Sequence, residues 1–170
     1  DAGNDVGPFE KAFRYSYQIV NGNQTSGAGA GDSIAIFHQI ESQVMANAGW
    51  EYQNSSSKIT LSFWVKSSIA GTFSLNIYQT DGNDHIAKPY TINSADTWEH
   101  KTVTFPGNTL ATINDDSTEG LQIQWFIASG TNSTTGSNGD VWGHYDQTKW
   151  AFGHVTNTHI TTDESTFQLT

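Results

Sequence analysis

The stretch Ile59–Ser68, ITLSFWVKSS, places an aromatic side chain where a polar one is expected. Apolar and polar residues alternate here, which predicts a β-strand whose apolar residues face inward. Trp64 then points outward, beside Lys66. A large ring left in water costs free energy, so protein or a ligand is expected to cover it. An exposed indole is also a surface on which the CH-bearing face of a pyranose can stack.

Two further segments carry the amides and rings that would complete a sugar-binding face. A hairpin through Ser68–Gly71 would pair Ile59–Ser68 with Gly71–Gln79, and Leu121–Ala128 is expected in the same sheet. Amide side chains exchange hydrogen bonds with sugar hydroxyls. In the alternative, the N-terminal segment or a neighbouring subunit covers the face. The predicted face consists of Trp64, Lys66, Asn76, Tyr78, Gln122, Gln124 and Phe126.

A second aromatic-rich segment, Val141–His154, follows a loop rich in Gly and Ser. Loops at the end of a β-sandwich often carry recognition while the sheets hold them in place. Trp142, Tyr145 and Trp150 are therefore further candidates for glycan binding. Alternatively, these aromatics close the open end of the sandwich or pack against another subunit.

No motif predicts catalysis. The carboxylates lie in turns, and the chain has no E-x-D-x-x-E run, G-x-S-x-G, P-loop or H-E-x-x-H. His144, His154 and His159 lie near Asp140 and Asp146, but their spacings match no metalloenzyme motif. We expect scattered loop histidines and no enzyme.

Charge and composition narrow the classes of partner. The 170 residues suit one domain, 1–170, and the chain has no cysteine for disulfides or thiolate sites. Seventeen acidic and seven basic residues give a net charge of -10, which opposes binding to nucleic acid or anionic membranes. No stretch reaches the roughly 20 apolar residues that cross a bilayer, so no membrane insertion is expected. The chain reads as an excised piece of a longer protein.

Alternating segments separated by Gly-, Asn- and Ser-rich turns predict an all-β chain of about seven or eight antiparallel strands. Only Glu41–Trp50 is expected to form a short helix. The fold that these elements favour is a two-sheet antiparallel β-sandwich, a jelly roll. The expected strands lie in Ala12–Val20, Ser33–Glu41, Ile59–Ser68, Gly71–Gln79, Thr97–Phe105, Leu121–Ala128 and Ser165–Thr170.

Residues Ile59–Phe105 resemble a known family. The FW-V-K strand, the GTFS strand and the Trp at the head of a TVTF strand are similar to jelly-roll carbohydrate-binding modules of the family 4 and family 9 type. From about Tyr17 to Thr170 the chain also resembles a domain of marine bacteriophage virion and tail-fibre proteins. The resemblance implies a galactose-binding-like sandwich with Trp98 in the core, whereas Trp50 and Tyr52 are open to rim packing or binding.

The resemblance also implies a function and a setting. It suggests a non-enzymatic domain on the surface of a virion or tail fibre, outside the cell, that recognises a polysaccharide or host-surface glycan. Other virion or fibre subunits are the expected protein partners, with a homotrimer in the parent protein. The alternatives are a structural module for subunit contacts and a binding module of a polysaccharide-degrading enzyme. Such modules often hold a structural Ca²⁺, for which the candidate ligands are Asp1, Asp5, Glu10, Asp163 and Glu164.

Overall fold

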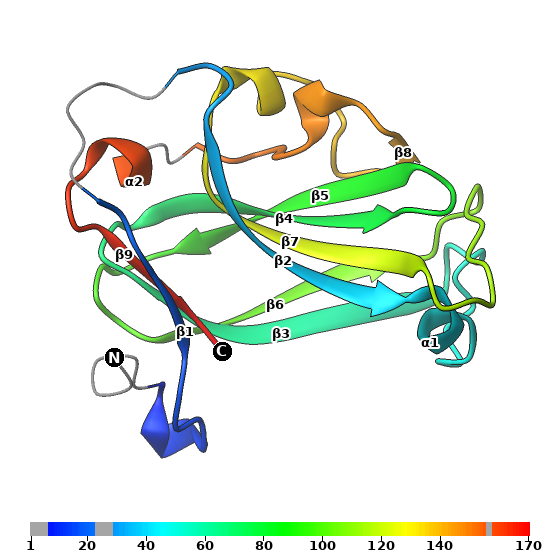
Figure 1. Cartoon of the computed structure of the whole chain (residues 1–170), viewed down its shortest axis with the longest axis horizontal. Coiled ribbons are helices and arrows are strands. Elements are labelled where there is room, and N and C mark those ends of the chain that lie inside the picture. The colour runs from blue at the N-terminus through cyan, green and yellow to red at the C-terminus, as the bar shows by residue number, and fades with distance from the viewer. Residues whose placement is uncertain (1–6, 23–28, 156–157) are drawn as a thin grey trace.

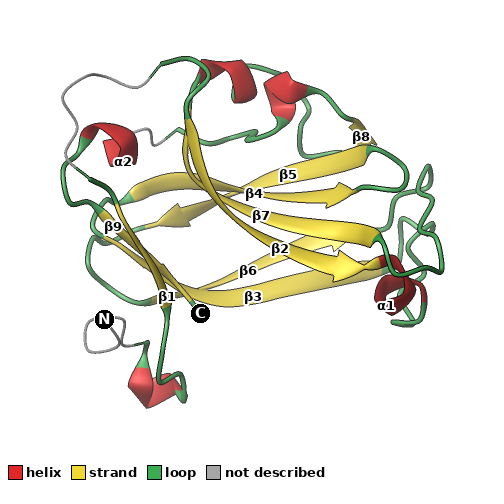
Figure 2. Ribbon diagram, viewed as in Figure 1, coloured by secondary structure: helices red, strands yellow, loops and turns green. Residues whose placement is uncertain are grey.

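The structure is a computed structural model that describes residues 7–22, 29–155 and 158–170. Within these ranges, nine strands form two antiparallel sheets that pack face to face (Figure 1 and Figure 2). The four-stranded sheet has the order β1 (Tyr17–Val20), β9 (Thr166–Leu169), β3 (Lys58–Ser67) and β6 (Glu99–Pro106). The five-stranded sheet has the order β2 (Ser33–Glu41), β7 (Glu119–Ser129), β4 (Gly71–Gln79), β5 (Asp84–Ile92) and β8 (Gly143–His144).

The strands pair as nested hairpins. β4 pairs with β5, β3 with β6, β2 with β7 and β1 with β9, so the first half of the chain runs alongside the second half in reverse. The resulting ribbon wraps around a common interior, and successive strands from β1 to β4 fall alternately in the two sheets. This is the pairing of a jelly roll, and the predicted antiparallel two-sheet sandwich is confirmed.

Helices are few and short among the described residues. α1 (Ser42–Ala46) lies inside the range predicted for a helix, and α2 (Thr158–Thr161) precedes β9. Single 3₁₀ turns occupy Phe9–Lys11, Thr131–Ser133 and Gln147–Lys149. None of the helices in the described part of the chain is long and apolar enough to span a membrane.

The core lies between the sheets and follows from the period of two. Each main strand gives alternate apolar residues to the interior, where burial removes them from water and stabilises the fold. Trp50 is 9% exposed and belongs to this core, and Tyr52 packs against it. The largest fully buried apolar side chains are Phe73, Leu75, Ile77, Ile86, Ile92, Phe105, Leu121, Ile127 and Phe167.

The predicted hairpin between Ile59–Ser68 and Gly71–Gln79 is wrong. β3 pairs with β6 and β9 in one sheet, and β4 pairs with β5 and β7 in the other. The short connection between β3 and β4 therefore crosses from one sheet to the other. Alternation predicts which residues of a strand face the core, but it does not say to which sheet the strand belongs.

A buried histidine ties the end of β3 to the segment before β9. His159 is 2% exposed, and its Nε2 lies 2.9 Å from the hydroxyl of Ser67 while its Nδ1 lies 3.1 Å from that of Ser165. Burial, with a smaller contribution from His154, lowers the pKa of His159 to about 4. Burial also lowers the pKa of His85 to about 4. Both rings are neutral in the folded protein at neutral pH.

We expect the free energy of unfolding to fall as the pH drops from about 6.5 to about 4. In this window the unfolded histidines, with a pKa of about 6.5, take up protons that the folded protein does not bind. Thermal melts at pH 7.5, 6.0 and 5.0 should show a falling Tm. His159→Gln should flatten this pH dependence in part, because His85 still contributes.

His38→Gln is the matched control, because His38 is an exposed residue of β2. It should melt with the pH dependence of the unaltered protein. A Tm that stays constant from pH 7.5 to pH 5.0 in the unaltered protein would contradict the proposed role of the buried rings.

Candidate functional site

Trp64 lies on the outer face of the four-stranded sheet, as the alternation of its strand predicts. Phe63 and Val65 on either side are buried in the core, and Trp64 is only partly buried. Its ring lines a pocket of about 400 Å³ that we call the indole pocket. The lining residues are Gly7, Pro8, Phe9, Glu10, Lys11, Trp64, Thr97 and Trp98.

The N-terminal segment forms one part of this pocket. Residues Phe9–Lys11 make a 3₁₀ turn, and Ala12 ends it with a left-handed φ of 69°. The Gly7 amide donates to the carbonyl of Arg14 at 3.3 Å. A Cβ at Gly7 would lie 2.7 Å from the carbonyl oxygen of Tyr15, so glycine is required for this close approach.

The turn before β6 brings Trp98 to the same pocket. Partial burial acts to raise the pKa of Glu99, but hydrogen bonds from Lys101, Ser94 and Asn93 outweigh it and lower that pKa to about 2. The Glu99 carboxylate accepts the backbone amides of Asn93 and Ser94, each at 2.8 Å. Asp96 has a φ of 55°, and its amide donates to the carbonyl of Ser67 at 2.7 Å. This turn therefore holds Trp98 beside the end of β3.

The expectation that Trp98 is a core residue is wrong. Its side chain is only partly buried and lies outside the hydrophobic core. The period of two already carried this signal: Val103 and Phe105 face inward, so the even-numbered residues Trp98 and His100 of the same segment face outward. The resemblance to modules with a core Trp gave the opposite and incorrect assignment.

Basic side chains surround both indoles. The Nζ of Lys11 lies 5.8 Å from the ring centroid of Trp64, and the Nζ of Lys66 lies 5.4 Å from that of Trp98. The ring of His100 lies 5.2 Å from Trp64, at an angle of 43°. An ammonium over an exposed indole contributes about 0.5–1 kcal/mol, so a ligand could displace either lysine at small cost.

The other outward side chains of this sheet are mostly polar and uncharged. Hydroxyls and amides dominate it, and Thr60 and Thr104 share a hydrogen bond of 2.8 Å across β3 and β6. The strand registers place no Asp or Glu among the outward residues of the four described strands. Those outward residues are Gln18, Val20, Lys58, Thr60, Ser62, Trp64, Lys66, His100, Thr102, Thr104, Pro106, Thr166 and Gln168.

The predicted glycan face divides between opposite sides of the molecule. Trp64 and Lys66 remain together on the four-stranded sheet, but the other five residues lie on the outer face of the five-stranded sheet. There β4 and β7 are neighbours as predicted, with Asn76 opposite Gln124 and Tyr78 opposite Gln122. A single face that contains all seven residues is therefore excluded.

Most of that second face is covered by the chain itself. Residues 130–155, which follow β7, run along β4 and β5 (Figure 1). The Asn76 amide donates to the carbonyl of Trp150 at 2.6 Å. Asn76, Gln124 and Phe126 are 0%, 1% and 2% exposed, so a ligand cannot contact them in this structure.

Three predicted residues form a ring cluster at the edge of this cover. The centroid of Trp150 lies 4.8 Å from Tyr145 and 5.0 Å from both Tyr78 and His85. Tyr145 is 47% exposed, but each contact of Trp150 uses part of its surface. The cluster attaches the covering segment to the sheet, and within it Trp150 is partly buried by three neighbouring rings.

The Trp142 side chain packs against the core of the sandwich. Its indole Nε1 donates to the carbonyl of Pro106 at 2.8 Å. The interpretation that an aromatic of Val141–His154 closes the sandwich therefore applies to Trp142.

The calcium prediction stays a prediction. Asp1 and Asp5 lie outside the described residues, and Glu10 lines the indole pocket. Asp163 and Glu164 lie in the turn between α2 and β9. Across residues 7–22, 29–155 and 158–170, no three His, Cys, Asp or Glu side chains converge as metal ligands would.

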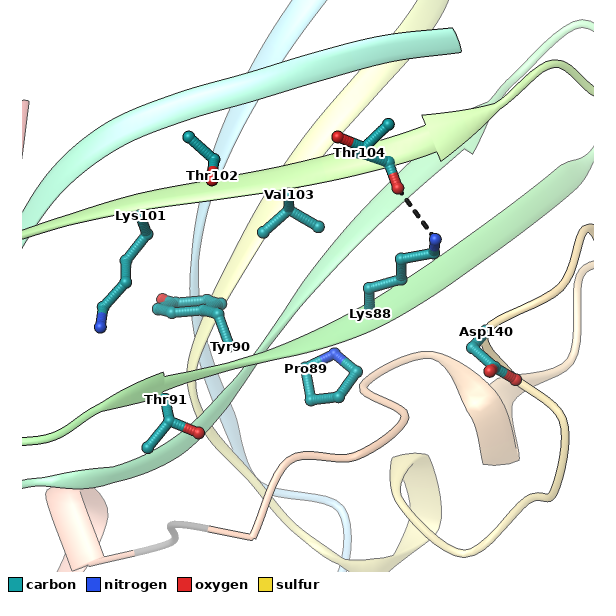
Figure 3. A pocket seen from close by; sticks show the side chains of 9 residues that line it. All are labelled: Lys88, Pro89, Tyr90, Thr91, Lys101, Thr102, Val103, Thr104 and Asp140. Carbon is teal, nitrogen blue, oxygen red and sulfur yellow. Dashed lines mark hydrogen bonds between the residues drawn. The ribbon is translucent and has the colours of Figure 1, made fainter. Parts of the chain in front are cut away.

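A larger cleft of about 490 Å³ lies between β5 and β6, at one edge of the sandwich (Figure 3). Lys88 reaches across it and donates to the carbonyl of Thr104 at 2.8 Å. Its one aromatic ring, Tyr90, is 7% exposed and packs on Phe63 and Phe73 in the core. Lys101 on the facing strand is paired with Glu99 at 2.5 Å. The cleft has no exposed ring for stacking, so the indole pocket is the better candidate site.

In comparisons with known proteins, no protein family, no curated protein and no solved structure matches the chain. The candidate site is defined by the geometry of this chain alone.

The position of Trp98 can be tested by its effect on stability. Trp98→Ala should reduce the free energy of unfolding by about 1 kcal/mol or less, because the ring is partly exposed. Phe105→Ala is the matched core variant, and it should lose about 3–5 kcal/mol because Phe105 is fully buried. In thermal melts, Trp98→Ala should lower the Tm by a few degrees and Phe105→Ala should lower it by roughly 10 °C. Equal losses in the two variants would contradict the outer placement of Trp98.

Proposed function

We propose that the chain is a non-enzymatic carbohydrate-binding domain that holds a glycan on the outer face of its four-stranded sheet. Trp64 is the stacking platform, and Trp98 forms a second wall of the site. Lys66 and the neighbouring hydroxyl and amide side chains exchange hydrogen bonds with the sugar.

One observation carries this proposal: two partly exposed indoles line one pocket of about 400 Å³. Large aromatic rings are normally buried, and two of them together at a surface pocket favour a ligand with an apolar face. A pyranose has such a face and a rim of hydroxyls. The residues around Trp64 supply the hydrogen-bonding partners that this rim requires.

The setting of the domain is proposed from the sequence resemblance. We place the domain on a bacteriophage virion or tail fibre, where it would recognise a host-surface glycan, and the parent protein would be a homotrimer. Several copies that act together would raise the avidity of a weak sugar site. The same pocket would also serve a binding module of a polysaccharide-degrading enzyme.

A structural role in subunit contacts is the second candidate function. It is favoured by an apolar groove of about 370 Å³ at the other edge of the sandwich, lined in part by Ile36, Leu61 and Leu169. Phe37 at this groove is 56% exposed. Association of the chain in light-scattering measurements, lost in Phe37→Ser, would support this role.

Trp64→Ala tests the proposed function. Loss of the stacking surface should weaken glycan binding tenfold or more, which corresponds to about 1.4 kcal/mol. The Tm should fall by only a few degrees, because Trp64 is on the outer face and only partly buried. A glycan array identifies a ligand, and calorimetric titration of both proteins with that ligand measures the change.

Tyr145→Ala is the control, because Tyr145 is an exposed aromatic on the opposite side of the sandwich. It should bind the same glycan with unchanged affinity. If Trp64→Ala instead lowers Tm by more than about 10 °C and leaves the affinity unchanged, Trp64 is a structural residue and the proposal fails.

A further inference from the structure

The charge of the indole pocket differs from the charge of the whole protein. The chain has a net charge of -10, with seventeen acidic residues and seven basic ones. Two of the seven, Lys58 and Lys66, point outward from β3, and a third, Lys11, lies over Trp64. As the strand registers show, no carboxylate is among the outward residues of the described strands of this sheet.

The carboxylate of Glu10 also lines the pocket, but no carboxylate of the described residues forms an ion pair with Lys11 or Lys66. Glu10 is exposed on the 3₁₀ turn, and Asp96 is exposed in the turn before Trp98. The three described ion pairs use Lys101, His144 and Lys149, while Lys11 and Lys66 lie over the two indoles. Two ammonium groups therefore lie beside two flat rings on one face.

We propose that the indole pocket selects acidic saccharides, in which a carboxylate or sulfate group accompanies a pyranose ring. The inference rests on the proposed function, since it names the class of sugar that the same site binds. The sugar ring lies against an indole, and its anionic group pairs with Lys66 or Lys11. A neutral sugar would use the ring surface and could accept a hydrogen bond from Lys66, but it has no anionic group to pair with the two ammonium groups.

Charge complementarity supports this ligand over a neutral one. Close to a protein surface, opposite charges attract more strongly than in bulk water, and salt screens the attraction over about 10 Å at 0.1 M. A polyanion approaching a protein of charge -10 is repelled on average, so binding requires a local basic face. The outer face of the four-stranded sheet is such a face.

Matched pairs of probes test the inference. Oligogalacturonate is compared with its methyl ester, and a sulfated galactan oligosaccharide with the unsulfated one, by calorimetric titration of the full chain at about 0.05 M and 0.5 M NaCl. We expect the acidic member of at least one pair to bind about tenfold more tightly at low salt, with the advantage reduced at high salt. The two pairs distinguish a carboxylate from a sulfate.

Substitutions then assign the preference to the pocket. Lys66→Gln should weaken the acidic probe much more than the neutral probe, because glutamine can still hydrogen-bond to a sugar hydroxyl but cannot pair with an anionic group. Lys149→Gln is the matched control, because Lys149 lies in the covering segment and pairs with Asp146 at 3.4 Å. It should keep the full preference. Lys58→Gln should have a smaller effect than Lys66→Gln, because six residues of an extended strand, roughly 20 Å, separate Lys58 from Trp64.

The results separate the two proposals. Tight binding of both members of a pair, weakened by Trp64→Ala but not by Lys66→Gln, would overturn the acidic preference and keep the proposed function. Absence of binding to every saccharide of the array and of both pairs would overturn both. Equally tight binding of polyglutamate would show recognition of negative charge alone and would overturn the saccharide assignment.

Discussion

Two sheets that share one apolar interior impose a parity on every main strand of this molecule. Residues of one parity are committed to the core, and residues of the other parity are left for the surface. In β3, Phe63 and Val65 are buried in the core, so the residue between them, Trp64, points to the outer face. In the segment of β6, Phe105 is fully buried, and this fixes Trp98 and His100 outside by the same rule. The indole pocket exists because these two parities place their rings on one side of one sheet.

The outer faces of the two sheets differ in how much of each is covered by other parts of the described chain. On the five-stranded sheet, residues 130–155 lie against the strands and cover part of the surface with their own aromatic side chains. On the four-stranded sheet, the segment around Phe9–Lys11 is the part of the described chain that borders the pocket, and it leaves most of the outward side chains accessible. The difference in cover explains why rings of similar composition act as internal packing on one side and as a candidate binding surface on the other.

The sequence predicts most of the strands because alternation is a local property, but β5 and β8 are strands that it did not predict. The short helix and the outward position of Trp64 follow from patterns within about ten residues, whereas the two-sheet sandwich was inferred from the number of strands and the near absence of helix. Which sheet a strand joins is not a local property, because it depends on how the nested ribbon wraps. The sequence-based expectation therefore put Asn76 and Tyr78 on the same face as Trp64, whereas they lie on the other sheet. The cover over Asn76 could not be predicted either, since its partner is the backbone of Trp150, far along the chain. Trp98 is a different case. The alternation of its segment predicts an outward side chain, and only the resemblance to other modules led to the core assignment.

The pairing of β1 with β9 has a consequence for how the chain folds. Gln18 and Gln168 hydrogen-bond to each other across a sequence separation of 150 residues. Closing so large a loop has a high entropic cost, so this contact gains stability only after the inner hairpins have brought the ends together. Contacts of high sequence separation also slow folding, and β1 and β9 each contribute only four residues to the sheet. β9 is held on both sides by β1 and β3, whereas β1 is the edge strand of this sheet. We therefore expect β1 to join the sheet last and its amide hydrogens to exchange with solvent before those of the central strands.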